Sequence, residues 1–127
     1  MLKNFEKLTN ELTEQELQTF LPIVLGGLRS KIGKSNAVPG SQIVRGVNSF
    51  LADRGITLKL SGVRLRKLIN HIRSNALIAG LCSSGKGYYV ASNKKELEEC
   101  IESQKQRIRS QERVVECLER QYLDLYL

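Results

Sequence analysis

The middle of the chain carries basic and amide side chains at spacings that suit contact with a polyanion. Between residues 61 and 75 they recur so that a helix would place most of them on one polar face. Arginine can bind phosphate or guanine through two parallel hydrogen bonds, and asparagine can bind adenine in the same way. One more lysine follows in a glycine-rich stretch. The candidate contact residues are Arg64, Arg66, Lys67, Asn70, His71, Arg73 and Lys86.

The helix expected over residues 61–75 also has an apolar face, which fixes the direction of the polar one. The apolar residues recur at helical period, and Ser61 is expected to be the N-cap. This stripe consists of Leu65, Leu68, Ile69, Ile72 and Ala76.

A β-hairpin is predicted directly after this helix. Residues 77–83 and 87–91 are short apolar, β-branched and aromatic runs on either side of a Ser-Gly-Lys-Gly turn. Tyr88 and Tyr89 alternate along the second strand, so we expect one in the core and one exposed. Lys86 would lie at the tip of the hairpin.

A basic amphipathic helix followed by a glycine-tipped basic hairpin resembles the recognition helix and wing of a winged helix-turn-helix domain. The resemblance covers roughly residues 12–92. The segment LIAGLCSSGKGYYVAS, followed by a charged helix, is also similar to small, mostly uncharacterised phage-borne winged-helix proteins of gut bacteria. The resemblance implies double-stranded DNA as the partner and Lys86 as a contact to phosphate or the minor groove.

Two further helices are expected upstream. Thr13 and Glu16 form a capping-box pattern, so the first should begin near residue 14, kink or restart at Pro22 and end near Gly33. A second helix, capped by Ser41, should run to about residue 53. Its C-cap is expected at residues 54–55, with the glycine in the left-handed conformation. A short strand is expected over residues 36–38.

From residue 93 onward the pattern predicts one long helix, with a cap formed by Asn93 and Glu96. Its apolar seam alternates at spacings of four and three, which is the heptad pattern of a coiled coil, and two glutamines interrupt its centre. The helix would either pair with a second copy or fold back over its own domain. The seam residues are Leu97, Ile101, Gln104, Ile108, Gln111, Val115, Leu118, Tyr122 and Leu125.

The net charge of +7 is concentrated in one segment. Residues 29–91 hold eleven lysines and arginines and one acid, a net charge of +10, whereas residues 1–28 and 92–127 are slightly acidic. Such a local excess predicts a negatively charged partner, of which DNA is the simplest because each neutralised phosphate releases counterions.

Patterns for catalysis, metal binding or membrane insertion are weak. Residues 27–35 and 80–87 imitate a phosphate-binding loop, but the first has the wrong glycine spacing and the second has glycine in place of the metal-binding hydroxyl. One histidine and three cysteines without a CxxC pair make a metal site implausible. No apolar run has the length of a membrane span, and the N-terminus is too polar for a signal peptide.

The sequence therefore predicts a mainly α chain with a small β-hairpin (α+β), that is, a winged helix-turn-helix followed by a long C-terminal helix. The expected divisions are a polar segment 1–12, the domain 13–92 and the helix 93–127. We expect a cytoplasmic, non-enzymatic DNA-binding homodimer without a cofactor or a small-molecule substrate. It would serve transcription regulation or DNA replication on a phage or mobile element. The alternative is a protein-interaction module that docks onto a larger assembly.

Overall fold

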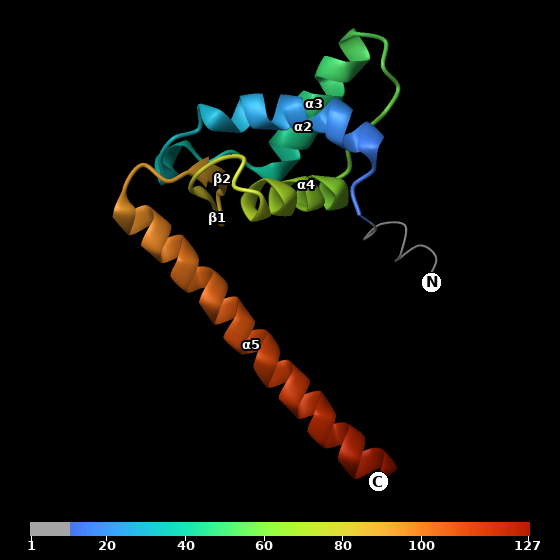
Figure 1. Ribbon diagram of the computed structural model, residues 1–127, viewed down its shortest axis with the longest axis vertical. Coiled ribbons are helices and arrows are strands. Elements are labelled where there is room, and N and C mark those ends of the chain that lie inside the picture. Colours follow the sequence, from blue (N-terminus) through green and yellow to red (C-terminus); the bar gives the residue numbers. More distant parts are fainter. Residues whose placement is uncertain (1–10) are drawn as a thin grey trace.

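The computed structural model describes residues 11–127, and in that range it is mainly helical (Figure 1). The expectation of a helical chain with one hairpin and a long C-terminal helix is confirmed at this level. Most of the predicted polar segment, residues 1–10, lies outside the described part. The elements are α2 (Glu14–Arg29), η1 (Lys34–Asn36), α3 (Gly40–Asp53), α4 (Gly62–Ser74), β1 (Leu81–Ser84), β2 (Gly87–Val90) and α5 (Lys94–Tyr126).

Helix α2 begins at the capping box that the sequence predicts. The Thr13 hydroxyl accepts a hydrogen bond from the Glu16 amide at 3.1 Å, and the Glu16 carboxylate accepts one from the Thr13 amide at 3.0 Å. The helix continues through Pro22 without a restart and ends at Arg29, one turn before the expected end at Gly33. The early end has a physical reason, because residues 31–33 bond to the second strand of the hairpin instead.

Helix α3 follows a proline rather than the predicted serine cap. Pro39 occupies the N-cap position with an extended backbone, and Ser41 lies inside the first turn, so the prediction of Ser41 as the cap is wrong. Val47 and Leu51 are buried in the core. Gly55 has a φ of 72°, which confirms the left-handed residue expected after the helix.

The side chain of Asn48 holds the connection between α3 and α4 in place. Its amide donates to the Leu60 carbonyl at 3.0 Å, and its oxygen accepts from the Leu60 amide at 2.7 Å. Both hydrogen-bonding groups of Leu60 are thereby satisfied while its side chain is 3% exposed. The seven-residue loop 54–60 thus ends at a fixed point in front of α4.

Helix α4 buries the predicted apolar stripe with one exception. Four of the five residues are at most 2% exposed, and Ser61 accepts from the Arg64 amide as the expected N-cap. Ala76 is the exception, because the helix ends at Ser74 and Ala76 is exposed with a φ of 51°. The buried residues are Leu65, Leu68, Ile69 and Ile72.

The hairpin pairs β1 with β2 in antiparallel register around a two-residue turn, with Cys82 opposite Tyr89 and Ser84 opposite Gly87. It begins at residue 81, later than the predicted residue 77. Tyr89 is 2% exposed, which confirms the core residue that the alternation predicts, but Tyr88 is half-buried against the core and not exposed as expected. Val38 extends the sheet by one bridge, since it exchanges two hydrogen bonds of 2.9 Å with Tyr88. The predicted strand at residues 36–38 is therefore a single bridged residue.

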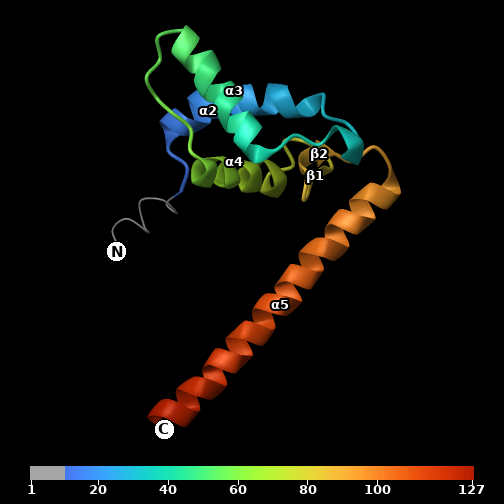
Figure 2. The ribbon, with the colours of Figure 1, turned by 180° about the vertical axis from the view of Figure 1, so that it is seen from behind.

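Helix α5 leaves the domain at the hairpin and projects away from it (Figures 1 and 2). None of its 33 residues is buried, and it supplies none of the core cluster, which lies between residues 20 and 81. Its start is fixed by Glu96, whose carboxylate accepts from the Ser92 amide at 2.8 Å and from the Lys34 amide at 3.1 Å. These bonds lower the pKa of Glu96. The helix does not lie over its own domain.

Gly87 is required by the close approach of Val38, which generates a prediction about the hairpin. A Cβ at Gly87 would overlap the Val38 carbonyl, and its φ of 124° disfavours any other residue. Gly87→Ala should therefore lower the free energy of unfolding by about 2 kcal/mol or more. Gly85→Ala is the matched control, because a Cβ there meets nothing within 4 Å. Urea denaturation should show a large loss for the first variant and little change for the second; equal stability would contradict the role given to Val38.

Candidate nucleic-acid interface

An open groove of about 830 Å³ lies between α4, the hairpin turn and the loop that precedes α3. The described residues that line it include four basic side chains and no acidic one. Cations that line a concave surface without counter-charges focus a positive potential into it. The basic residues are Arg66, Arg73, Lys86 and Arg107.

Arg66 and Asn70 lie one turn apart on α4 and form the exposed centre of this groove. Both are exposed, whereas Ile69 beneath them is buried in the core. Among the described residues, the side chains of Arg66 and Asn70 have no hydrogen-bond or ion-pair partner. The two side chains that are best suited to read guanine and adenine are therefore free and adjacent.

Arg73 connects α4 to the hairpin at the edge of the groove. Its Nε donates to the Leu81 carbonyl at 3.2 Å, at the start of β1. Its Nη2 is buried and has no partner in the described part of the chain. A guanidinium nitrogen without a partner is costly to bury, and because Nη2 has almost no exposed surface, a ligand could reach it only after the side chain moves.

The hairpin turn forms one wall of the groove. Ser84 accepts a hydrogen bond from the Lys86 amide at 3.2 Å, which closes the turn, and the Lys86 side chain is exposed at the tip. Glycines flank Lys86 on both sides, so the backbone here can approach another surface closely. Lys86 therefore lies at the tip of the hairpin, as the sequence predicts.

Arg107 is a groove residue that sequence reasoning missed. It belongs to α5 and reaches the groove because that helix starts beside the hairpin and runs past it. In the sequence it is one of many charged residues that flank the heptad seam. No local pattern could have marked it, because its position depends on the direction in which α5 leaves the domain.

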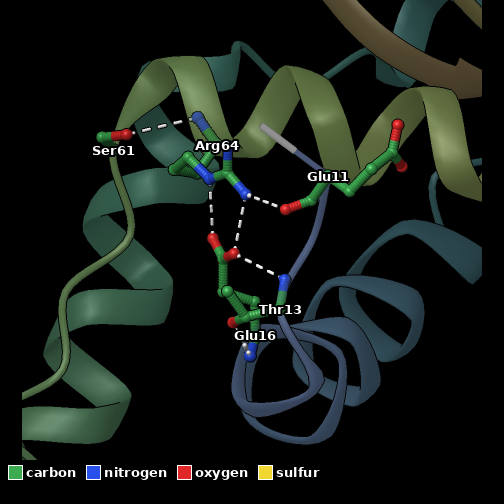
Figure 3. Close-up of polar contacts among 5 residues, drawn as sticks. All are labelled: Glu11, Thr13, Glu16, Ser61 and Arg64. Atoms are coloured by element: carbon green, nitrogen blue, oxygen red, sulfur yellow. Dashed lines mark hydrogen bonds and ion pairs between the residues drawn. The ribbon is translucent and has the colours of Figure 1, made fainter. Parts of the chain in front are cut away.

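Arg64, the first predicted contact residue, is engaged inside the protein (Figure 3). Its Nε and Nη2 donate to the two carboxylate oxygens of Glu16, each at 2.7 Å, and Nη2 also donates to the Glu11 carbonyl at 3.2 Å. The side chains of Arg64 and Glu16 are 14% and 12% exposed. The pair joins α4 to the first turn of α2, and a DNA contact by Arg64 stays a prediction that this geometry does not favour.

The ion pair shifts the charge equilibria of both partners. The bonds from Arg64, together with the amide and hydroxyl of Thr13, lower the pKa of Glu16 from about 4.5 to about 2, although burial acts in the opposite direction. Burial alone would lower the pKa of Arg64, but the Glu16 carboxylate raises it. Both groups are therefore charged across the physiological range.

Lys67 and His71 lie on the other side of α4, away from the hairpin. They line a second hollow of about 360 Å³ together with Glu11 and Leu12, which precede α2, and Leu17 from its first turns. The Asn75 amide donates to the His71 carbonyl at 2.9 Å and so closes the end of the helix. The predicted contact residues therefore fall into three groups. Arg66, Asn70, Arg73 and Lys86 line the groove, Lys67 and His71 line the second hollow, and Arg64 is bound to Glu16.

Among the described residues, no metal site, membrane-spanning helix or reactive thiol competes with the groove as the candidate functional site. Within residues 11–127 no group of three histidine, cysteine or acidic side chains could hold a metal ion, and no helix has the length and hydrophobicity to span a membrane. Burial, with a smaller contribution from Cys100, raises the pKa of Cys82 to about 12, so this thiol stays protonated and unreactive at neutral pH.

Comparisons with protein-family models, with curated proteins and with solved structures find no match to this chain.

The Arg64–Glu16 pair predicts a specific dependence of stability on pH. Because the pKa of Glu16 is depressed in the folded state, its contribution is present above pH 4.5 and is lost as the pH falls toward 2. Glu16→Gln should lower the free energy of unfolding by about 2 kcal/mol at pH 7, and the difference from the unmodified chain should shrink in acid. Glutamine keeps the capping box, so the variant isolates the charge.

Glu14→Gln is the control for this measurement. It removes the same charge from the same helical turn at an exposed position. Denaturation curves between pH 7 and pH 2 should show little effect of this control. An equal loss in both variants would mean that the overall charge, and not the contact with Arg64, determines the stability.

Proposed function

We propose that this chain binds double-stranded DNA in the groove between α4 and the hairpin. The observation that carries the proposal is the composition of that groove, which has four basic side chains, one free asparagine and no acid among the described lining residues. A surface that is charged only for contact with solvent would carry both acidic and basic side chains, as α5 does. The described lining of this groove carries only basic ones. DNA supplies the matching charge, and its bases supply partners for arginine and asparagine.

The order of the elements supports docking of the winged helix-turn-helix kind. Three helices precede a hairpin, the third presents its polar face beside the turn, and Val38 backs the sheet from the connection between the first two helices. The loop 54–60 is longer than the turn of a compact helix-turn-helix, which winged variants tolerate. In this docking α4 enters the major groove and the hairpin lies along the backbone.

The side chains have different roles in this proposal. Arg66 and Asn70, at the exposed centre, contact base edges, and Lys86 and Arg73 contact phosphates at the rim. Lys67 and His71 line the flank nearest the N-terminal segment and contact the backbone there. Arg64 positions α4 through Glu16 and makes no contact with DNA.

The biological process that fits best is transcription regulation or DNA replication on a phage or mobile element, as the resemblance implies. The rival function is a protein-interaction module, and the exposed seam of α5 favours some protein contact. The two functions differ in the ligand of the groove. Only the first requires the basic groove to bind a polyanion.

The test measures DNA affinity against salt concentration. Fluorescence anisotropy with random and genomic duplexes should show binding whose logarithmic slope against salt becomes smaller by roughly one for each phosphate contact removed. Lys86→Glu should weaken binding to all sequences alike, because it places a negative charge beside the backbone. Arg66→Ala should weaken binding and reduce discrimination between sequences by about 1–3 kcal/mol.

Arg45→Glu serves as the control for Lys86→Glu. Arg45 is an exposed residue of α3 outside the groove lining, and the substitution changes the net charge by the same amount. It should leave the affinity nearly unchanged. If the control and Lys86→Glu weaken binding equally, only the net charge matters; if the folded chain binds no DNA at low salt, the interaction-module function takes its place.

A further inference from the structure

The seam of α5 is long and uncovered, and it is apolar except at Gln104 and Gln111. The helix has 33 residues, which corresponds to a length of about 50 Å. The apolar residues of the seam are between 38% exposed, at Leu97, and 70% exposed, at Leu125. From residue 105 onward every residue is exposed. Most of the stability of such a helix must come from burying its seam, and its own domain does not bury it.

We infer that the seam pairs with a second copy of this chain in a parallel, in-register, two-stranded coiled coil. In the heptad numbering that the spacing gives, β-branched residues occupy three of the four a positions and leucines occupy three of the five d positions, the combination that favours two parallel strands. The a residues are Ile101, Ile108, Val115 and Tyr122, and the leucines at d are Leu97, Leu118 and Leu125.

The two glutamines determine the direction of the pairing. Gln104 and Gln111 both occupy d positions. In a parallel, in-register pair each meets its own copy, and two facing amides can bond to each other. In an antiparallel pair d residues face a residues, so each glutamine would meet an aliphatic or aromatic side chain and bury an amide without a partner. That penalty disfavours the antiparallel arrangement.

A charge pair supports the same arrangement. Arg107 lies at a g position, and Glu112 lies at the e position of the next heptad. Side chains at these two positions meet across a parallel interface, so Arg107 can pair with the partner's Glu112, and the groove of the paired chain then keeps Arg66, Arg73 and Lys86 as its basic residues. Over residues 98–113 the opposite face of the helix is polar and already has its own ion pair, between Arg109 and Glu102 at 2.9 Å. In this stretch a narrow apolar seam with a polar back suits one partner helix and not a larger bundle. Nearer the end of the helix, Val114, Leu123 and Tyr126 are exposed apolar residues that lie off the seam.

The structure leaves room for the partner helix beside the domain. Leu97, Ile101, Gln104 and Ile108 line a hollow of about 500 Å³, and the segment 76–81 forms much of its other wall. Farther along, residues of α5 alone line a shallow groove from Ile108 to Glu119. The seam is therefore accessible over its first half as well as beyond the domain.

The oligomeric state of the full chain tests the pairing. Multi-angle light scattering should give twice the monomer mass. Ile108→Lys combined with Val115→Lys should give a folded monomer, because two charges at facing a positions repel their copies. The matched control is Gln106→Lys combined with Ser110→Lys, which adds two lysines to the opposite face of the same helix and should leave the dimer intact.

Disulfide trapping tests the direction. In a background with Cys100→Ser and Cys117→Ser, Leu118→Cys should form a covalent dimer under mild oxidation, because facing d residues of a parallel pair come within disulfide distance. In an antiparallel pair the two cysteines would lie several turns apart. Arg120→Cys in the same background, on the outer face, should remain uncrosslinked.

Each outcome has a defined meaning. A monomer at high micromolar concentration overturns the pairing, and a dimer in which Leu118→Cys forms no crosslink overturns the parallel direction. A double-lysine seam variant that stays dimeric places the interface elsewhere. None of these measurements involves DNA, so the result is independent of the proposal for the groove.

Discussion

The contact between Arg64 and Glu16, together with the buried apolar stripe of α4, determines which face of that helix is free. The guanidinium of Arg64 lies against the first turn of α2, where the same carboxylate also completes the helix cap. Such charged hydrogen bonds contribute about 1.5–3 kcal/mol each, enough to favour one rotation of α4 over another. With Arg64 directed into the domain, the next basic residue on the helix, Arg66, faces outward beside the hairpin. The composition of the groove follows from this orientation.

Much of the fold could be predicted because it is encoded locally. The capping box at Thr13, the cap at Ser61, the left-handed Gly55 and the apolar stripe of α4 each depend on residues within a few positions of one another. The predictions are wrong where a contact with a distant segment of the chain sets the local structure. Helix α2 ends early because residues 31–33 bond to β2, and no pattern within α2 reports that contact.

The candidate site was predicted less well, for the same reason. The helical period correctly places basic residues on the polar side of α4, but that side is wide and its edges meet different neighbours. Arg64 bonds to an acid 48 positions earlier in the chain and Arg73 bonds to the Leu81 carbonyl, whereas Arg66 has no partner among residues 11–127. Three arginines with the same sequence signature therefore have a structural, a mixed and an exposed role. Only the tertiary packing separates them.

The groove and the seam of α5 are mechanically linked through one short segment. Glu96 ties the first turn of α5 to the amides of Ser92 and Lys34, and the same loop continues into Val38, which backs the hairpin. The direction of α5 is therefore set relative to the hairpin turn. A parallel pair of such helices would hold two domains at one end of the coil, related by its two-fold axis. Two grooves held in that way would act on one duplex as a tethered pair, so their joint affinity would exceed that of either groove without any new contact to DNA.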